Sequence, residues 1–390
     1  MKILMLAPEP FFQPRGTPIS VYFRLKTLSE LGHQTDLITY PLGEDINFSG
    51  LEIHRIPNLL RAKKIKIGPS WIKIPYDFLM FWKAFFKLAG GERDLIFSHE
   101  EAALPGAVLG KIWRVPHLYD MHSSLPQQLE NFDFSRSALL KRIFLRIEQF
   151  ILKNSQAVIV ICQDLQETVR KEGAGSKSVL IENFLDFPGP DYSARDIEAR
   201  RRELVPGGKK VVLYAGNFEP YQGISLLLKA VAGVDGRAVF LLVGGSSAEN
   251  KEMAKKAAAL GIGERIILVD RVPPSEVPLY IGLADVLVSP RLSGTNTPLK
   301  IYSFLKSGKP VVATRLWTHT QVLNDGISVL VDPTAEGLAQ GISFALFNEE
   351  ARRRAQAAKS LAEREYTPSR YKEKIKNSLA MARVNFDKGR

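Results

Sequence analysis

The chain has 390 residues, which is more than a single compact core usually holds, and we therefore expect two domains. Its 45% hydrophobic and 24% charged residues are typical of globular proteins and argue against a disordered chain. The apolar runs are too short to span a bilayer, and the single cysteine, Cys162, excludes an intramolecular disulfide framework.

The start of the chain, Lys2–Ala7, is apolar but too short for a secretory signal, so we predict that it forms a first buried strand. Cys162 ends another apolar run, and there we expect a buried strand thiol rather than a nucleophile. Both observations fit a cytoplasmic protein in a reducing compartment.

Short apolar runs alternate with amphipathic helical patterns along the chain. Nearly continuous apolar strands separated by helices indicate parallel sheets that are covered on both faces. The predicted strands are 3–7, 35–39, 95–98, 117–120, 157–162, 179–181, 211–215, 238–243, 266–269, 286–289, 311–313 and 328–331.

This alternation stops between about 184 and 210, where prolines, glycines and a charge-rich helical stretch follow one another. We therefore predict an N-terminal Rossmann-like domain over 1–185, a linker over 186–208 and a C-terminal Rossmann-like domain over 209–365. Residues 366–390 have the pattern of a helix that could pack back on the N-terminal domain. The predicted fold class is α/β, with two doubly wound parallel-sheet domains facing each other across a cleft.

Both predicted domains open with a strand, a glycine-containing loop and a helix. The first loop holds Arg15, Gly16 and Thr17, and the second runs from Gly216 to Gly223. Ligands of doubly wound sheets bind at the carboxyl ends of the strands, where these loops lie. Two such loop sets leave room for two substrates, one on each domain.

The segment 294–310 has the strongest local pattern. Thr297 is a suitable helix N-cap, Pro298 a suitable first helical residue, and Gly308 a suitable end. Free backbone N–H groups and the dipole at such a helix start favour a diphosphate. Lys300 stands in the first turn, where acids are preferred, and a bound anion would explain it. An ordinary capped helix without a ligand is the alternative.

Basic and aromatic residues gather between Arg61 and Lys87, in a chain whose net charge is +12. The segment has seven aromatic residues and seven Lys or Arg against one acid, Asp77. It suits an anionic membrane, with the protein peripheral on the inner face of the plasma membrane. Alternatively, it is a core-facing helix with Lys83 and Lys87 in water. No nucleic-acid motif is present, so no such partner is expected. A second basic run includes Arg136, Lys141, Arg142 and Arg146.

Seven short motifs then follow one another at the ends of predicted strands and helices. They are Leu31-Gly-His33, Tyr119-Asp-Met-His122, Ile181-Glu-Asn183, Leu213-Tyr-Ala-Gly216 with Gln222-Gly223, Leu242-Val-Gly244, Asp270-Arg-Val272 and Ser307-Gly-Lys-Pro-Val-Val-Ala313. In this order, and over nearly its whole length, the chain resembles the large retaining glycosyltransferase family four. That family has the GT-B architecture of two Rossmann-like domains.

The resemblance implies transfer of a hexose, with retention, from a UDP- or GDP-sugar to a hydroxyl of a glycan or lipid-linked acceptor. It implies that Lys300 and the helix start stabilise the leaving diphosphate, with His122 near the sugar. It places the acceptor beside Arg15, Gly16 and Thr17, and implies a domain closure that excludes water. The donor would be bound by Gly216, Asn217, Gln222, Gly244, Val272, Thr295, Asn296, Thr297, Pro298, Leu299 and Ser303.

The chain also departs from the family pattern. Members often carry two glutamates eight positions apart, for the donor sugar and the ribose, and Thr295 and Ser303 stand there instead. The usual Arg and Lys of the phosphate loop are replaced by Asn217 and Gln222, which are neutral. These departures motivate one alternative, a non-catalytic relative that binds a glycan, lipid or partner enzyme. A sugar-nucleotide epimerase of the same fold, which would need no acceptor, is a further alternative. The cations that could substitute are Lys300, Arg291 and Arg271.

Several other signatures are absent from the sequence. There is no Asp-x-Asp pair, no Walker sequence, no Gly-x-Gly-x-x-Gly fingerprint and no His-Glu-x-x-His spacing. We therefore expect no metal ion and no cofactor other than the nucleotide-sugar co-substrate.

Overall fold

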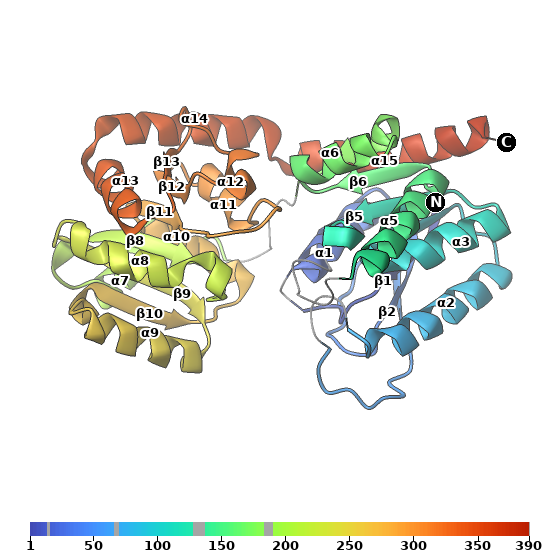
Figure 1. Ribbon diagram of the computed structural model, residues 1–390, viewed down its shortest axis with the longest axis horizontal. Coiled ribbons are helices and arrows are strands. Elements are labelled where there is room, and N and C mark those ends of the chain that lie inside the picture. The colour runs from blue at the N-terminus through green and yellow to red at the C-terminus, as the bar shows by residue number, and fades with distance from the viewer. Residues whose placement is uncertain (14–15, 66–69, 128–136, 183–189, 390) are drawn as a thin grey trace. The chain divides into compact units, whose positions relative to one another are not determined.

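The computed structural model describes residues 1–13, 16–65, 70–127, 137–182 and 190–389. The chain divides into two compact units, one comprising Met1–Glu182 and Ser369–Arg390 and the other Asn183–Pro368. Each unit is built on one parallel sheet with helices packed against it (Figure 1). The predicted α/β class with two parallel-sheet domains is confirmed.

The first unit contains a seven-stranded sheet in the order β3-β2-β1-β4-β5-β6-β7. All neighbouring strands are parallel, and the order reverses between β1 and β4. The strands are β1 (Lys2–Ala7), β2 (Gln34–Thr39), β3 (Leu51–Arg55), β4 (Leu95–His99), β5 (His117–Met121), β6 (Ala157–Val160) and β7 (Ser178–Leu180). The helices are α1 (Thr17–Glu30), α2 (Lys73–Ala89), α3 (Ala103–Trp113), α5 (Ala138–Asn154), α6 (Gln163–Lys171) and α15 (Pro368–Lys388).

The second unit contains a six-stranded sheet in the order β10-β9-β8-β11-β12-β13, again parallel throughout. Here the order reverses between β8 and β11. The strands are β8 (Lys210–Ala215), β9 (Ala238–Gly245), β10 (Ile266–Asp270), β11 (Val286–Ser289), β12 (Val311–Thr314) and β13 (Val329–Val331). The helices are α7 (Ala194–Leu204), α8 (Ile224–Ala230), α9 (Ser247–Ala259), α10 (Val277–Leu283), α11 (Lys300–Lys306), α12 (Trp317–Thr320), α13 (Ala335–Phe347) and α14 (Glu349–Glu365).

Apolar side chains on both faces of each sheet form the cores. In the first unit, Leu4 and Leu6 pack with Met80 of α2, and Tyr119 and Val158 pack with α5 and α6 on the same face, while Ile3 and Met5 are buried on the other. Both faces of the second sheet are covered in the same way. Because every strand is buried on both sides, polar groups gather where the strands end, and at the reversal points neighbouring loops diverge and leave room for a ligand.

Four local predictions need correction. β3 was not predicted, because Leu51–Arg55 alternates polar and apolar residues at the sheet edge instead of forming a continuous apolar run. β6 ends at Val160, so the buried Cys162 is the N-cap of α6 rather than a strand residue. The segment predicted as a linker contributes α7, which packs against α10 in the second unit. α11 begins later than predicted, at Lys300. Within the described part of the chain, no helix has both the length and the apolar character needed to cross a membrane.

Candidate functional site

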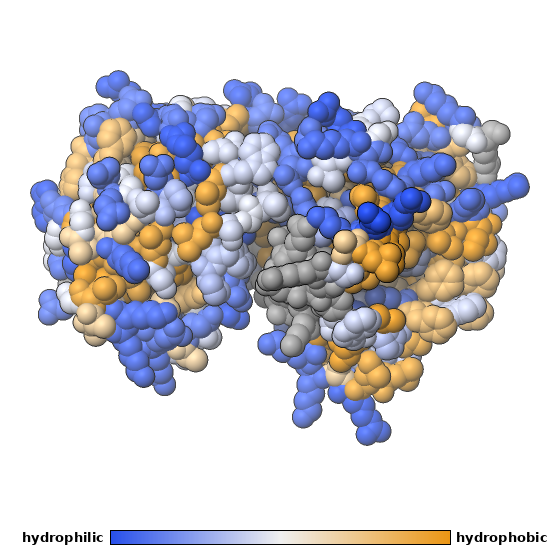
Figure 2. All heavy atoms as spheres, in the orientation of Figure 1, coloured by the Kyte–Doolittle hydropathy of each residue, from blue (hydrophilic) through white to orange (hydrophobic). Residues whose placement is uncertain are grey.

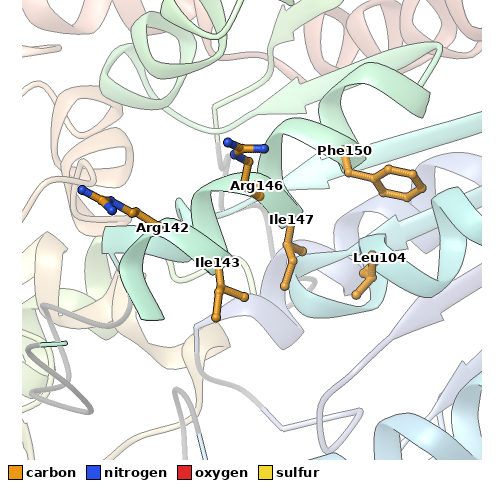
Figure 3. A pocket seen from close by; sticks show the side chains of 6 residues that line it. All are labelled: Leu104, Arg142, Ile143, Arg146, Ile147 and Phe150. Carbon is orange, nitrogen blue, oxygen red and sulfur yellow. The ribbon is translucent and has the colours of Figure 1, made fainter. Parts of the chain in front are cut away.

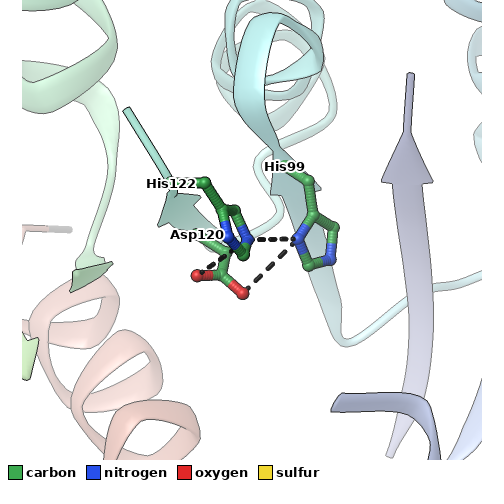
Figure 4. Close-up of side chains that lie close together, drawn as sticks. All are labelled: His99, Asp120 and His122. Atoms are coloured by element: carbon green, nitrogen blue, oxygen red, sulfur yellow. Dashed lines mark hydrogen bonds and ion pairs between the residues drawn. The ribbon is translucent and has the colours of Figure 1, made fainter. Parts of the chain in front are cut away.

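A compact group of charged side chains lies at the carboxyl ends of β4 and β5 in the first unit (Figure 4). His99 is the last residue of β4 and pairs in register with Asp120 of β5, and His122 follows that strand. His99 Nδ1 lies 3.4 Å from Asp120 Oδ2, and His122 Nε2 lies 3.4 Å from Asp120 Oδ1. The two ring nitrogens are 3.3 Å apart. All three side chains are buried.

Arg24 of α1 completes this group and contacts both oxygens of Asp120. Its Nε donates to Asp120 Oδ2 at 2.9 Å, and both side chains are fully buried. Burial opposes ionisation of Asp120, but Arg24 and His122 more than offset it and hold the pKa of the carboxyl far below its usual range. Burial lowers the pKa of His99 to about 3, so this ring is neutral at physiological pH.

Two carboxyl groups stand beside this group at the same strand ends. Glu9 follows β1 and is 8% exposed, and burial together with Glu100 raises its pKa well above the ordinary value. Glu100 follows β4. Its Oε2 accepts a hydrogen bond from Ser123 at 2.8 Å, and its Oε1 accepts one from Thr17 at 3.5 Å.

The residues predicted to bind the acceptor are therefore partly brought together. Thr17 and His122 share this edge, since Glu100 bonds to Thr17 and to Ser123, the neighbour of His122. Gly16 is the exposed N-cap of α1, with a φ of +52° that favours glycine. Arg15 lies outside the described residues.

Lys300 stands at the start of α11 in the second unit and points to the end of β8. Its Nζ lies 3.8 Å from the centre of the Tyr214 ring, and a Cβ built on Gly216 would lie 3.0 Å from it. The side chain is partly exposed, but the nitrogen is buried and has no hydrogen-bond partner among the described residues. Burial, and then Arg291, lower the pKa of Lys300 well below its ordinary value.

Arg291 follows β11 and faces the same loop. Its Nη1 donates to Asn296 O at 2.8 Å and to Thr318 Oγ1 at 2.7 Å, while burial lowers its pKa. Within the described residues, three more buried polar atoms of this loop region lack a partner: Arg291 Nε, Gln222 Oε1 and Thr297 Oγ1. Two buried cations and several unsatisfied polar atoms at one sheet edge are typical of an anion site.

The helix start differs from the prediction. α11 begins at Lys300, its N-cap is Leu299 without a side-chain bond, and Thr297 and Pro298 lie before it. Thr297 therefore does not cap the helix, because its hydroxyl is buried in the loop and bonds to no backbone N–H of the described residues. The helix has only seven residues, so charged side chains and not the helix start dominate the potential here.

The remaining predicted donor residues lie in loops at the ends of several strands of the second sheet, except Ser303, which lies on α11. The carbonyl oxygen of Asn217 accepts a bond from Tyr214 at 2.6 Å, and that of Thr295 accepts one from Gln321 at 2.6 Å. A Cβ on Gly244, whose φ is +120°, would lie 2.4 Å from Gly216 O. Val272 follows β10 and packs against the core, while Ser303 is partly buried on α11.

Five polar residues of the first unit were not predicted as site residues: Arg24, His99, Asp120, Glu9 and Glu100. His99 and Asp120 directly end or follow predicted strands, and the strand order alone would have placed them side by side. Arg24 gave no signal, because an arginine within an amphipathic helix is usually solvent-exposed.

Comparisons with known proteins identify the class that this fold and these sites define. A family model described as glycosyl transferase 4-like domain matches residues 25–183, and one described as glycosyl transferases group 1 matches residues 196–360. Together they span both units. The chain therefore belongs to the group 1 glycosyltransferases, with a glycosyl transferase 4-like N-terminal half.

Individual proteins agree with this family. The chain is 28% identical over 354 residues to D-inositol 3-phosphate glycosyltransferase of Corynebacterium glutamicum, covering 81% of each protein. It is 27% identical over 384 residues to phosphatidyl-myo-inositol mannosyltransferase of Mycobacterium tuberculosis, covering 94% of this chain and 93% of that protein. The solved structure of Anabaena HepE in complex with UDP-glucose matches with a TM-score of 0.74 at 19% identity, covering 97% and 99% of the chains. The predicted GT-B fold and glycosyltransferase class are confirmed.

Proposed function

We propose that the protein transfers a hexose from a UDP- or GDP-sugar to a hydroxyl of a glycan or lipid-linked acceptor, with retention of configuration and without a metal ion. The observation that carries this proposal is the buried ammonium of Lys300, which has no hydrogen-bond partner among the described residues. A buried ammonium without a counter-charge is unfavourable, and a bound diphosphate would supply that charge. The HepE complex with UDP-glucose supports a nucleotide-sugar as the source of the diphosphate.

The donor would bind to the second unit at the ends of β8 and β11. Lys300 and Arg291 would contact the phosphate oxygens, and Gly216 would let them approach, because any Cβ there would meet the Lys300 ammonium. The hydroxyl of Thr297 and the amide of Gln222 add neutral groups with unsatisfied atoms. As the bond to the sugar breaks, the two cations would stabilise the charge that develops on the leaving diphosphate.

The acceptor would bind to the first unit, at the edge that carries Thr17 and His122. This edge argues against a catalytic metal ion. His99, Asp120 and His122 have suitable ligand atoms close together. However, Arg24 already bonds to both oxygens of Asp120, and its charge would repel a cation. The names of both curated relatives support an inositol-containing acceptor, free or lipid-linked.

A lipid-linked acceptor fits the exposed surface of α2 and α3. Trp71, Phe78 and Phe86 are 74%, 63% and 66% exposed, and Phe85 of α2 contacts Trp113 of α3 at 5.5 Å between ring centres. Figure 2 shows apolar side chains gathered over this side of the unit. The aromatic surface and the net charge of +12 together suit an anionic membrane.

α5 extends this apolar and basic character. A groove of about 410 Å³ is lined by the apolar side chains of Leu104, Ile143, Ile147 and Phe150 and by the two basic residues Arg142 and Arg146 (Figure 3). Vesicle sedimentation tests the membrane contact. Phe78→Ser with Phe86→Ser should abolish binding to vesicles rich in phosphatidylglycerol, while the exposed Phe347→Ser of the second unit should not. Equal binding by all three proteins would reject this surface.

A thermal-shift screen against UDP-, GDP-, ADP- and TDP-sugars tests the proposed transfer. A donor at a hundred times its dissociation constant stabilises the protein by about 2.7 kcal/mol, which is easily detected. Lys300→Ala should abolish the shift, whereas Lys306→Ala, an exposed lysine of the same helix, should keep it. Donors that shift the parent are then incubated with inositol and glycolipid acceptors, and the anomeric configuration of the product is read by NMR.

One specific observation favours a second candidate, a glycosyltransferase-like binding protein. Thr295 and Ser303 supply no carboxylate, and the carbonyl of Thr295 is already bonded to Gln321. A donor-induced thermal shift without product, for any acceptor, would favour this candidate over the enzyme. If none of these nucleotide-sugars changed the melting temperature of a folded sample, a nucleotide-sugar donor would be excluded.

A further inference from the structure

The chain turns sharply from β4 into α3 at Glu100, beside the residues proposed to bind the acceptor. β4 ends at His99, one short helical turn, η1 (Glu100–Ala102), follows, and α3 begins at the next residue. Glu100 has a φ of +47°, in the left-handed region that glycine adopts freely and that a side chain makes unfavourable. The backbone is therefore strained at a position where a glycine would make the same turn without strain.

The position of Glu100 differs from that of comparable residues. Among the described residues other than glycine, Arg61 and Arg114 also have a positive φ. Both are exposed, and Arg114 is the C-cap of α3, where a left-handed residue commonly ends a helix. Glu100 is partly buried at a junction between a strand and a helix, at the carboxyl end of the sheet. Strained residues in such places are often functional.

The side chain of Glu100 joins two segments of this sheet edge. Its Oε2 accepts a hydrogen bond from Ser123 Oγ at 2.8 Å, and its Oε1 accepts one from Thr17 Oγ1 at 3.5 Å. Ser123 directly follows His122 in the segment after β5, and Thr17 is the first residue of α1. One carboxyl group thus bonds to the start of α1 and to the neighbour of His122.

The next residue anchors the same turn to a third element. Glu101 Oε1 forms an ion pair at 2.7 Å with the ammonium of Lys73, the first residue of α2. The two side chains are only 13% and 27% exposed, so this pair is shielded from water. η1 is therefore held to α2, and Glu100 reaches the other two segments from a fixed base.

The carboxyl group of Glu100 is also unfavourable where it stands. Burial raises its pKa, and the bond from Ser123 and the charge of His122 only oppose that rise. A buried carboxyl on a strained backbone contributes little to the stability of the fold. Its contacts with Thr17 and Ser123 offer a better reason for its presence.

We infer that Glu100 is a positioning residue, which holds Thr17 and the segment of His122 and Ser123 at the separation that an acceptor requires. The strained turn is the means, because it places the carboxyl group between the two segments. The effect on the acceptor rests on the proposed transfer. The joining of the two segments does not.

Hydrogen exchange of the full-length protein without ligand tests the joining. The amides of Ile19 and Leu125 are hydrogen-bonded and report on the start of α1 and on the segment after β5. Glu100→Gly removes both side-chain contacts and should accelerate exchange at both amides at least about threefold. Arg114→Gly relieves the same type of strain at the other end of α3 and should change neither. Unchanged exchange at either amide in Glu100→Gly would overturn the inference.

Thermal unfolding of the same variants separates positioning from folding. Both glycine variants should keep the Tm within about 2 °C of the parent or raise it. In Glu100→Gly the relief of strain and of a buried carboxyl offsets the lost contacts. A fall of more than about 5 °C in Glu100→Gly alone would show that the residue serves folding, and the inference would be wrong.

Steady-state kinetics with the donor and acceptor that react fastest test the effect on the acceptor. Glu100→Gly should raise the acceptor KM about tenfold and leave the donor dissociation constant within about twofold of the parent. Glu100→Gln should recover most of this loss, because its amide can accept from Ser123 and donate to Thr17.

Two kinetic results would contradict the inference. One is an acceptor KM of Glu100→Gly within about twofold of the parent, and the other is no recovery in Glu100→Gln, which would mean that the charge itself binds the substrate. If the parent transfers no sugar to any acceptor, the proposed function fails. The exchange of Ile19 and Leu125 still decides whether Glu100 joins the two segments.

Discussion

The carboxyl ends of the two sheets have the same topology but differ in whether their buried charges are balanced. In the first unit the buried charges are balanced, because Asp120 is bonded to Arg24 and is close to two histidines. In the second unit Lys300 and Arg291 are both cations, and neither the Lys300 ammonium nor Arg291 Nε has a partner among the described residues. The second group lies where the strand order reverses, and the first lies next to such a point, at the ends of β4 and β5; both are usual ligand positions.

The difference shows how the two ends relate to a ligand. A balanced buried pair is stable without a ligand, so the first end keeps its geometry before a substrate arrives. A buried lysine without a counter-charge tends to lose its proton, and it becomes fully charged when an anion binds next to it. The second end would therefore gain electrostatic stabilisation from a bound anion, and substitutions at the two ends should have opposite effects on the unliganded protein.

The largest expected effect follows removal of Arg24. Arg24→Met keeps much of the side-chain volume but leaves the carboxylate of Asp120 buried without its main counter-charge. Breaking a buried pair on one side costs about 3–5 kcal/mol. For a domain of this size that is a fall in Tm of about 10 °C, measured by scanning calorimetry.

An exposed pair provides the control. Arg237 bonds to Asp235 in the second unit and its side chain is 74% exposed. Arg237→Met should therefore change stability by less than about 1 kcal/mol. If Arg24→Met were no more destabilising than Arg237→Met, the stability of the first unit would not depend on the charge balance around Asp120.

How far the sequence predicts this fold depends on the type of strand. Continuous apolar runs such as those of β1 and β8 identify central strands, since both faces are buried. β3 is an edge strand with only partial burial, and its short alternating pattern is not distinct from a loop. The capping pattern at Thr297 was misleading because the backbone before Lys300 follows the loop, whose conformation is set by tertiary contacts from Arg291, Thr318 and Gln321.

The site could be predicted where loops follow strands, and not where the partners are distant in sequence. Lys300 and His122 could be chosen as candidate site residues from the sequence because each stands next to a recognisable strand or helix end. The pairing of Arg24 with Asp120 spans 96 residues, and its bond to Tyr371 spans 347. Only the packing of α1 and α15 against the sheet brings these residues together, and no local pattern records that packing.

The next effect concerns proton uptake at Lys300. Because its pKa is lowered in the folded protein from an ordinary 10.5, the unfolded chain binds more protons between the two values. The stability of the unliganded parent should therefore rise with pH across that window, and this rise should be smaller in Lys300→Met. Below the window Lys300→Met should be as stable as the parent or more so, because it removes a buried charge.

Donor binding should raise the pKa of Lys300 again, so the protein should take up protons when the donor binds. Calorimetry in two buffers of different ionisation enthalpy should show net uptake by the parent and none by Lys300→Met. Burial keeps the neighbouring His319 neutral by lowering its pKa to about 4, and it raises the pKa of Tyr214, so neither supplies the proton site near neutral pH. Uptake that persists in Lys300→Met would place the anion elsewhere.

The smallest expected effect comes from the support of the cationic loop. Thr318 Oγ1 accepts from Arg291 and donates to Asn296 O at 2.6 Å, so it holds both ends of the loop. Thr318→Val keeps the shape and removes about one net hydrogen bond, worth about 1 kcal/mol. We expect the donor dissociation constant to rise about fivefold, measured by calorimetry.

The unfolding temperature separates loop support from general packing. Thr318 is buried, and its substitution leaves Arg291 Nη1 with one partner instead of two. If the loop is held in place for an anion, affinity should fall while the unliganded Tm changes by only about 2–4 °C. The same fall in Tm with an unchanged donor dissociation constant would mean that Thr318 only packs the core. Arg291 would then reach its ligand position without Thr318.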